Sequence, residues 1–230
     1  FKPTGRNNRN VEITQTYDVD YGWDLLGRYS GMYVSRHVGD DMKMGLSRIV
    51  SMLAAVPNVD YAVSGSKMTG LKIADRPVEE LLFVNAGNVE RGNSQIQASI
   101  TANAEWLKRV VEANGLEAVG PLRIISTDLG RETYNFDVAQ AVRKKDGSAV
   151  GKPSLQGPVL HVQTPAGKVA TASYTGYMAE LDNVRNALRA WTLTNGYEIG
   201  DRPYESYKAG IASSFTENGQ FDVYYPLKNK

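Results

Sequence analysis

The sequence predicts an α+β fold: duplicated β-α-β-β half-repeats form an antiparallel sheet system with two amphipathic helices. Three observations predict it. Strand-like apolar alternation recurs on both sides of two helix-like segments. An Asn-Gly pair, Asn114-Gly115 and then Asn195-Gly196, closes each helical pattern. A Phe-Asp-Val strand follows in each copy, at 136–138 and 221–223. Because two copies are too few for a solenoid, they favour one closed domain.

The first sixty residues differ from the rest. Apolar and polar residues alternate from Val11 to Tyr17, which is typical of a half-buried strand, and Gly22, Gly27 and Gly31 then break the pattern. Asp40 or Asp41 is expected to cap a helix that ends before Pro57. We therefore expect a strand-turn-helix segment over residues 1–60 and a separate domain over 61–230.

Each half-repeat contains the same order of predicted elements. The first, about residues 65–145, has a strand at 79–85, a helix with Ile96, Ile100, Leu107 and Val111 on one face, and strands at 122–127 and 134–142. The second, about residues 155–230, has a strand at 168–175, a helix with Leu181, Val184, Leu188 and Trp191 on one face, and strands at 204–209 and around 221–223. These apolar stripes predict that both helices pack on the sheet.

The composition excludes several function classes. Lys and Arg exceed Asp and Glu by one (26 − 25), so no excess of positive charge indicates nucleic-acid binding. The chain has no cysteine and only two histidines, which argues against a metal site or a thiol nucleophile, and we expect no cofactor. No apolar run reaches the 18 or more residues of a membrane span. Because the chain begins at Phe1, a targeting segment or anchor is not excluded, and the cytoplasm is the default location.

The second half-repeat resembles a known family. Gly167-Lys168-Val169-Ala170, Tyr174-Thr175-Gly176-Tyr177, Arg202-Pro203-Tyr204-Glu205-Ser206-Tyr207 and Tyr225-Pro226-Leu227-Lys228 occur in the order found in the GyrI-like small-molecule-binding family. That family includes effector-binding domains of bacterial multidrug regulators. The match is good over residues 157–230 and looser over 65–145. The resemblance implies a groove between the two halves, lined by aromatic residues, with an acidic residue near its centre.

By its motif, the family's acidic residue corresponds to Glu205. Strand alternation places Glu205 and Tyr207 on one face and Tyr204 and Ser206 on the other, and a carboxylate in a semi-buried apolar groove favours a cationic partner. Glu205 is two residues after Pro203, and the residue two positions after Pro121 in the first half is Arg123. The first half therefore has a basic residue where the second half has the acidic one. The candidate ligand-binding residues are Glu205, Tyr207, Tyr174, Tyr177, Trp191, Tyr224, Arg123 and Phe136. Tyr224 and Tyr225 alternate, so at most one of them lines the groove.

A second resemblance concerns the N-terminal segment. Tyr21-Gly22, Gly27-Arg28-Tyr29, Val38-Gly39-Asp40 and Gly45-Leu46 are similar to the end of a START-like (SRPBCC) helix-grip domain, its last strand and C-terminal helix. Sixty residues cannot form such a grip, so the resemblance implies a remnant.

The sequence therefore favours non-catalytic binding of an amphipathic, cationic or aromatic small molecule, with Glu205 as its counter-charge. One alternative is a GyrI-like hydrolase of strained electrophiles, in which Glu205 serves as the general base. Another is an inhibitor-type module whose groove binds a protein partner. No helix-turn-helix is evident, so we expect no nucleic-acid partner.

Overall fold

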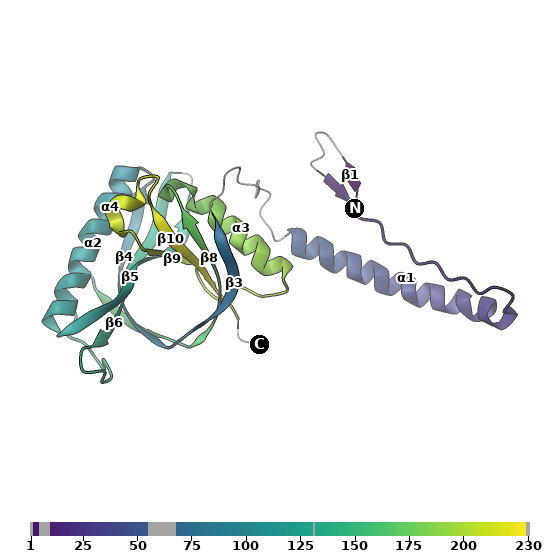
Figure 1. Cartoon of the computed structure of the whole chain (residues 1–230), viewed down its shortest axis with the longest axis horizontal. Helices are drawn as coiled ribbons and strands as arrows, with labels where there is room; N and C mark the ends of the chain where they lie inside the picture. The colour runs from purple at the N-terminus through teal and green to yellow at the C-terminus, as the bar shows by residue number, and fades with distance from the viewer. Residues whose placement is uncertain (1, 5–9, 55–67, 131, 229–230) are drawn as a thin grey trace. The chain divides into compact units, whose positions relative to one another are not determined.

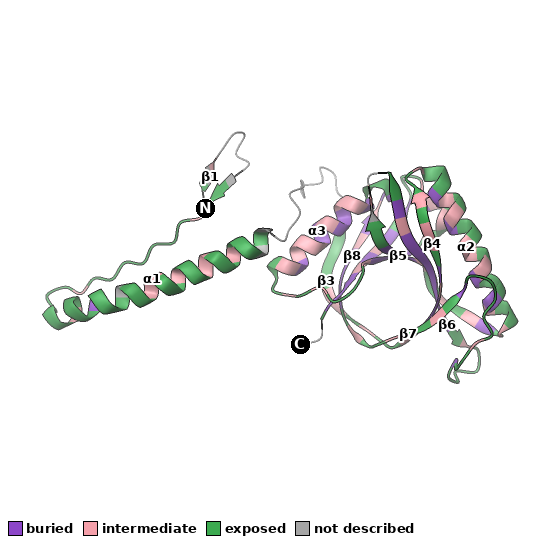
Figure 2. Cartoon of the chain, turned by 180° about the vertical axis from the view of Figure 1, so that it is seen from behind, coloured by how far each residue is buried: buried purple, intermediate pink, exposed green. Residues whose placement is uncertain are grey.

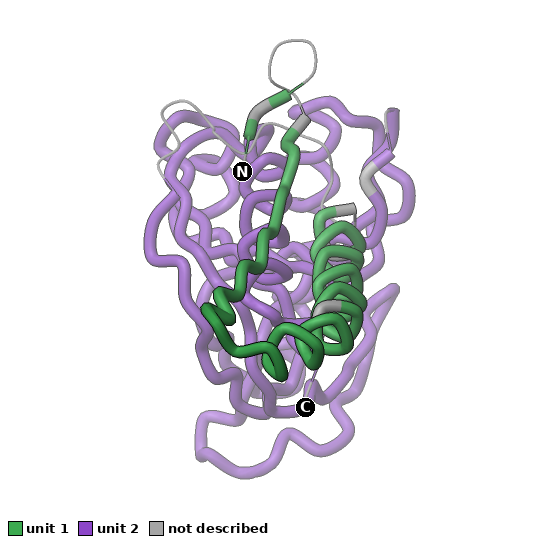
Figure 3. Tube along the Cα trace, turned by 90° about the vertical axis from the view of Figure 1, so that its right-hand side faces the viewer, with its two compact units in different colours: residues 1–55 green, residues 56–230 purple. Residues whose placement is uncertain are grey.

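The computed structural model describes residues 2–4, 10–54, 68–130 and 132–228. Two compact units divide the chain at residues 55 and 56 (Figure 3). Among the described residues, no helix is both long and apolar enough to cross a membrane.

The N-terminal unit contains β1 (Lys2–Thr4), β2 (Asn10–Glu12) and α1 (Leu25–Ala54). The first two strands pair with each other. The predicted helix cap at Asp40 or Asp41 is wrong, because both residues lie inside α1. Asp24 caps it instead, since its side chain accepts a hydrogen bond from the backbone N–H of Gly27 at 2.9 Å. Much of α1 is exposed (Figure 2).

The glycines in α1 reflect a close contact rather than a turn. The ring of Tyr21 lies against the helix, where a Cβ atom built on Gly31 would be 2.6 Å from it. Gly31 therefore allows the preceding segment to pack on α1 without ending the helix. The predicted strand over 11–17 is limited to the short β2, and the chain from 13 to 20 has no regular structure.

The second unit is built on one antiparallel sheet of eight strands. The sheet is curved (Figure 1). The sheet order is β3-β8-β10-β9-β5-β6-β4-β7. Its strands are β3 (Thr69–Arg76), β4 (Glu79–Glu90), β5 (Leu116–Leu129), β6 (Thr133–Lys144), β7 (Leu160–Thr164), β8 (Gly167–Thr175), β9 (Tyr204–Tyr207) and β10 (Gln220–Pro226). Its helices are α2 (Asn93–Ala113), η2 (Met178–Glu180), α3 (Leu181–Thr194) and α4 (Gly210–Ser214).

The sheet order confirms the α+β class and shows the internal symmetry. Each half supplies four strands, and the halves meet where β9 pairs with β5. The leading strand of each half is exchanged: β3 pairs with β8 of the second half, and β7 pairs with β4 of the first. The half-repeats are therefore β-β-α-β-β, one strand longer than the sequence pattern indicates.

The two long helices of this unit lie on the outer side of the curved sheet (Figure 1). α2 packs on β4, β5 and β6, and α3 packs on β8 and β10. Each ends at its predicted Asn-Gly pair, where Gly115 (φ 61°) and Gly196 (φ 79°) adopt the left-handed conformation that glycine favours. The core lies between this side of the sheet, here called the helix-covered face, and the helices. The opposite side is called the inner face.

Candidate functional site

Glu205 lies at the centre of the molecule. Its strand, β9, borders the junction of the two halves. Glu205 pairs in register with Ile124 of β5 on one side and with Val223 of β10 on the other. Its side chain is on the helix-covered face and has no exposed surface. Tyr207 is on the same face and is also buried, as strand alternation predicts.

Arg185 of α3 supplies the positive charge next to this buried carboxylate. Its Nε donates a hydrogen bond to Oε1 of Glu205. Its Nη1 donates to Asp182 at 2.8 Å, and its Nη2 donates to the hydroxyl oxygen of Tyr134 at 3.1 Å. Burial by itself lowers the pKa of Arg185, but the charge and hydrogen bond of Glu205 together with Tyr134 and Asp182 outweigh this effect and hold that pKa well above its ordinary value. The pair is therefore a charged, internal ion pair.

Three tyrosines surround the ion pair. The hydroxyl of Tyr134 is within hydrogen-bond distance of Ser126 Oγ (2.7 Å), and because it accepts from Arg185, its own proton is available to Ser126. Burial raises the pKa of Tyr134 and that of Tyr225 to about 12. Burial likewise raises the pKa of Tyr207 well above its ordinary value. All three phenols therefore stay neutral at physiological pH and present hydrogen-bonding groups rather than charges.

Two buried polar atoms in this cluster lack a partner. Neither Oε2 of Glu205 nor the hydroxyl of Tyr207 has a hydrogen-bond partner among the described residues. An unpaired buried polar group costs about 1–3 kcal/mol. Native structures contain few such groups, so this pair marks a place where a bound group could complete the hydrogen bonding.

A cavity of about 520 Å³ borders the ion pair. Arg185 lines it together with Tyr225 and Ser126. Its rim also carries the carboxylates of Asp128, Asp182 and Asp201. The guanidinium of Arg185 therefore touches both the cavity and the buried carboxylate of Glu205.

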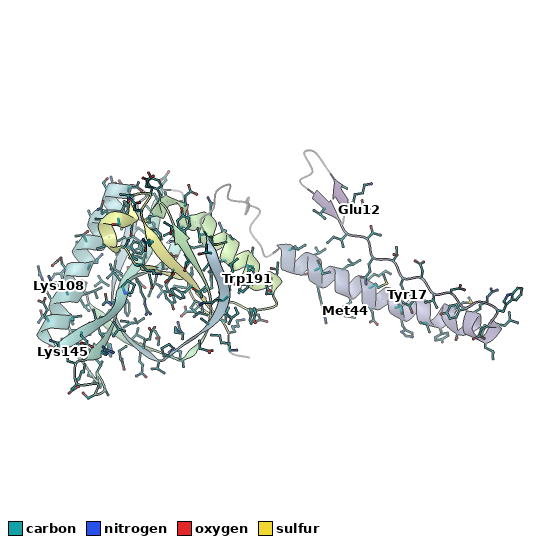
Figure 4. The ribbon with its side chains drawn as sticks, in the orientation of Figure 1. Glu12, Tyr17, Met44, Lys108, Lys145 and Trp191 are labelled. Carbon is teal, nitrogen blue, oxygen red and sulfur yellow. The ribbon has the colours of Figure 1, made fainter. Side chains whose placement is uncertain are left out.

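The structure brings together only some of the predicted site residues. Phe136 is fully buried beside the cluster, with its ring 4.6 Å from that of Tyr134. Tyr174 is buried on the same face but stacks on Phe221. Trp191 is half-buried on α3 (Figure 4), and Tyr177 is half exposed.

Tyr224 and Arg123 lie on the inner face, away from Glu205. Tyr224 stacks on Tyr204, with ring centroids 4.7 Å apart. Arg123 is opposite Ser206 in the β5–β9 register, so the residue that shares the face of Glu205 is Ile124. The prediction that Arg123 is equivalent to Glu205 is therefore wrong. The register of β5 shifts between Val119 and Arg123, and a one-residue shift moves a side chain to the other face.

Sequence reasoning missed Arg185, Tyr134 and Tyr225. Arg185 falls four residues after Leu181 and one after Val184, on the apolar stripe of its helix. A charged residue within such a stripe is a signal that was available. Tyr225 is two residues after Val223 and four after Phe221, and both of these face the core. Strand alternation was therefore a signal that could have placed Tyr225 on the face of Glu205.

The described residues contain no group of three or more His, Asp or Glu side chains that could hold a metal ion. His161 instead lies 2.8 Å from Glu80, on adjacent strands at the edge of the sheet. Neither residue is near the Glu205 cluster in the sheet order.

Comparison with known proteins shows the fold. No family model matches the sequence, and no curated protein matches it. Among solved structures, a chain of the EcmrR–DNA complex in EcmrR-RPo matches with a TM-score of 0.57 and 17% identity, over 88% of this chain and 71% of that chain. The crystal structure of the EcmrR C-terminal domain matches with the same TM-score and identity, over 72% of this chain and 99% of that chain.

An uncharacterized conserved protein from Listeria innocua matches with a TM-score of 0.50 and 12% identity, over 69% of this chain and 92% of that chain. The chain therefore shares its α+β fold with the C-terminal domain of EcmrR.

Proposed function

We propose that this protein binds an amphipathic small molecule, cationic and aromatic, at the Glu205–Arg185 ion pair, without a chemical step. The observation that carries the proposal is the buried carboxylate of Glu205, which keeps one oxygen unpaired, on the strand face that also holds Tyr207 with its unpaired hydroxyl. A ligand that carries a positive charge and a hydrogen-bond donor would satisfy both atoms. The surrounding phenol rings offer flat faces to an aromatic body.

In this proposal, Arg185 competes with the ligand. Its guanidinium already neutralises Glu205, so a ligand cation that reaches the carboxylate must displace it. The neighbouring cavity offers the displaced guanidinium the carboxylates of Asp128 and Asp201, in addition to Asp182, with which it is already paired. Displacement therefore exchanges one ion pair for others, which limits its cost and makes affinity depend on the strength of the Arg185–Glu205 pair.

The test is a thermal-shift titration of the full chain with ethidium, an aromatic cation, and with anilinonaphthalene sulfonate as the matched aromatic anion. A ligand at about 100 times its dissociation constant adds about 2.7 kcal/mol of stability. We expect ethidium to stabilise the parent protein and Glu80→Gln, which alters a carboxylate outside the cluster. It should not stabilise Glu205→Gln.

A second variant protects the test against a folding defect in Glu205→Gln. Arg185→Met with Glu205→Gln removes both charges together, so it should fold and yet gain no stability from ethidium. Arg185→Met alone should bind ethidium more tightly than the parent. If ethidium stabilises the double variant as much as the parent, or if the anion alone binds, the proposed cation site is refuted. The hydrolase and inhibitor alternatives stay predictions.

A further inference from the structure

The inner face of the sheet carries a second set of charged groups, which are partly buried. Arg123 donates from Nη1 and Nη2 to the two carboxylate oxygens of Glu79, at 2.6 Å each. Its guanidinium lies 5.4 Å from the centre of the Tyr204 ring. This arrangement is rigid, because a bidentate pair and a ring contact both fix the same side chain.

Arg76, at the end of β3, differs from Arg123 in having no acidic partner. Among the described residues no carboxylate lies within ion-pair distance of it, and its Nη2 donates to the backbone oxygen of Pro165 at 3.2 Å. The Nε atoms of Arg76 and of Arg123 are both buried and donate to no acceptor among the described residues. Within the described part of the chain, this region of the inner face thus has one arginine without an ion-pair partner and two buried N–H donors without acceptors, although Asp75, Asp201 and Asp222 also line the cavities here.

Two cavities meet at these arginines. One, of about 270 Å³, has apolar walls formed by Leu81, Phe83, Ile125, Val162 and Pro165. The other, of about 360 Å³, lies over β3, β8 and β10 and includes Tyr224. Arg76, Glu79, Arg123 and Tyr204 line both. The acidic groups of the first cavity that are most buried are already paired, Glu79 with Arg123 and Asp137 with Arg202.

We propose that the inner face binds a small apolar monocarboxylate. Its carboxylate accepts hydrogen bonds from the free Nε atoms of Arg76 and Arg123, and its tail occupies the apolar cavity. The two unpartnered N–H donors match the two oxygens of one carboxylate, and guanidinium groups suit carboxylate geometry. The cavity volume lies near the lower end of small-molecule sites, which favours a ligand with one short chain or one ring.

This site is independent of the proposed function because β9 separates the two. Tyr204 and Glu205 are consecutive, so their side chains are on opposite faces of the same strand. Loss of one site therefore need not alter the other, and the two ligands carry opposite charges.

The experiment is isothermal titration of the full chain with octanoate and with octanamide, its uncharged analogue. We expect octanoate to bind and octanamide to bind at least about tenfold more weakly, as loss of a charge-assisted hydrogen bond predicts. Arg76→Gln should weaken octanoate binding by about tenfold or more. Lys145→Gln removes an exposed lysine in the turn after β6, which lines neither cavity, and should change the affinity by less than about twofold.

Two further variants keep the result decisive. Val162→Trp fills the mouth of the apolar cavity from the edge strand and should abolish octanoate binding even if Arg76→Gln folds poorly. Glu205→Gln should leave octanoate binding unchanged, so failure of the cation site does not imply failure of this one. Undetectable binding of octanoate, equal affinity for octanamide, or full affinity in both Arg76→Gln and Val162→Trp would overturn the proposal.

Discussion

The buried ion pair makes a sharp prediction about stability. Removing one partner of a buried pair typically costs about 3–5 kcal/mol, whereas replacing both by neutral groups is often nearly neutral. Arg185→Met leaves Glu205 with no charged partner, because Oε2 is already unpaired and Oε1 loses Arg185 Nε. Tyr134 keeps Ser126. We therefore expect Arg185→Met to fall at the upper end of this range.

Glu205→Gln should cost less than Arg185→Met. Its amide oxygen can still accept from Arg185, and the guanidinium keeps Asp182 at 2.8 Å. In a domain of this size, 3–5 kcal/mol corresponds to a fall in Tm of roughly 6–20 °C. The double variant should recover most of that loss.

The assay is urea unfolding of the parent, the two single variants and the double variant, followed by circular dichroism. The coupling free energy from this cycle should reach about 2–3 kcal/mol. Two results would refute the reasoning. One is a loss below about 1 kcal/mol in Arg185→Met, which would mean that the pair is hydrated. The other is a double variant whose loss equals the sum of the single losses.

The other predictions concern alkaline pH and a close contact. Because burial raises the pKa of Tyr134 and Tyr225 to about 12 from 10, the folded chain retains protons that the unfolded chain loses above pH 10. The free energy of unfolding should be constant below pH 10 and then fall by roughly 1.4 kcal/mol per pH unit for each tyrosine, with a smaller fall in Tyr134→Phe. Urea unfolding at pH 9, 10 and 11 checks this, and a flat profile contradicts it. Gly157 has a positive φ (59°), and a Cβ there would lie 2.6 Å from the Trp106 ring. Gly147 has φ 74°, but a Cβ there would meet open space. Thermal melts should therefore show a loss of stability of about 1 kcal/mol for Gly147→Ala and a larger loss for Gly157→Ala. Equal losses would exclude the ring contact as a cause.

Much of the second unit could be predicted because its signals are local. The Asn-Gly helix ends and the apolar stripes of α2 and α3 depend on neighbouring residues, and both helices end where these signals indicate. The sequence pattern predicts the cap of α1 at Asp40 or Asp41 rather than at Asp24, because Gly27 and Gly31 are typical of a break. Gly31 instead accommodates the ring of Tyr21, a contact that no local rule contains.

The candidate site was predicted only in part because it depends on register. Glu205 is indicated by the family motif, and alternation within one strand then places it on the same face as Tyr207. The placement of Arg123 depended on counting residues along β5 from Pro121. The register shift in that strand moves the side chain of Arg123 to the inner face of the sheet. Arg185 reaches Glu205 from a separate helix, and such a contact follows from tertiary packing rather than from spacing.

The exchanged strands have a consequence for how such a chain can arise and assemble. Because β3 completes the second half and β7 completes the first, neither half alone has its full set of strands. A chain containing only one half would leave an unpaired strand edge, which is a template for another copy. Two such chains would restore the eight-stranded sheet by trading their leading strands. The duplicated protein is therefore equivalent to a strand-swapped dimer joined into a single polypeptide. That joining freed the two halves to diverge, so that one central position now carries a buried carboxylate and its symmetry mate carries isoleucine.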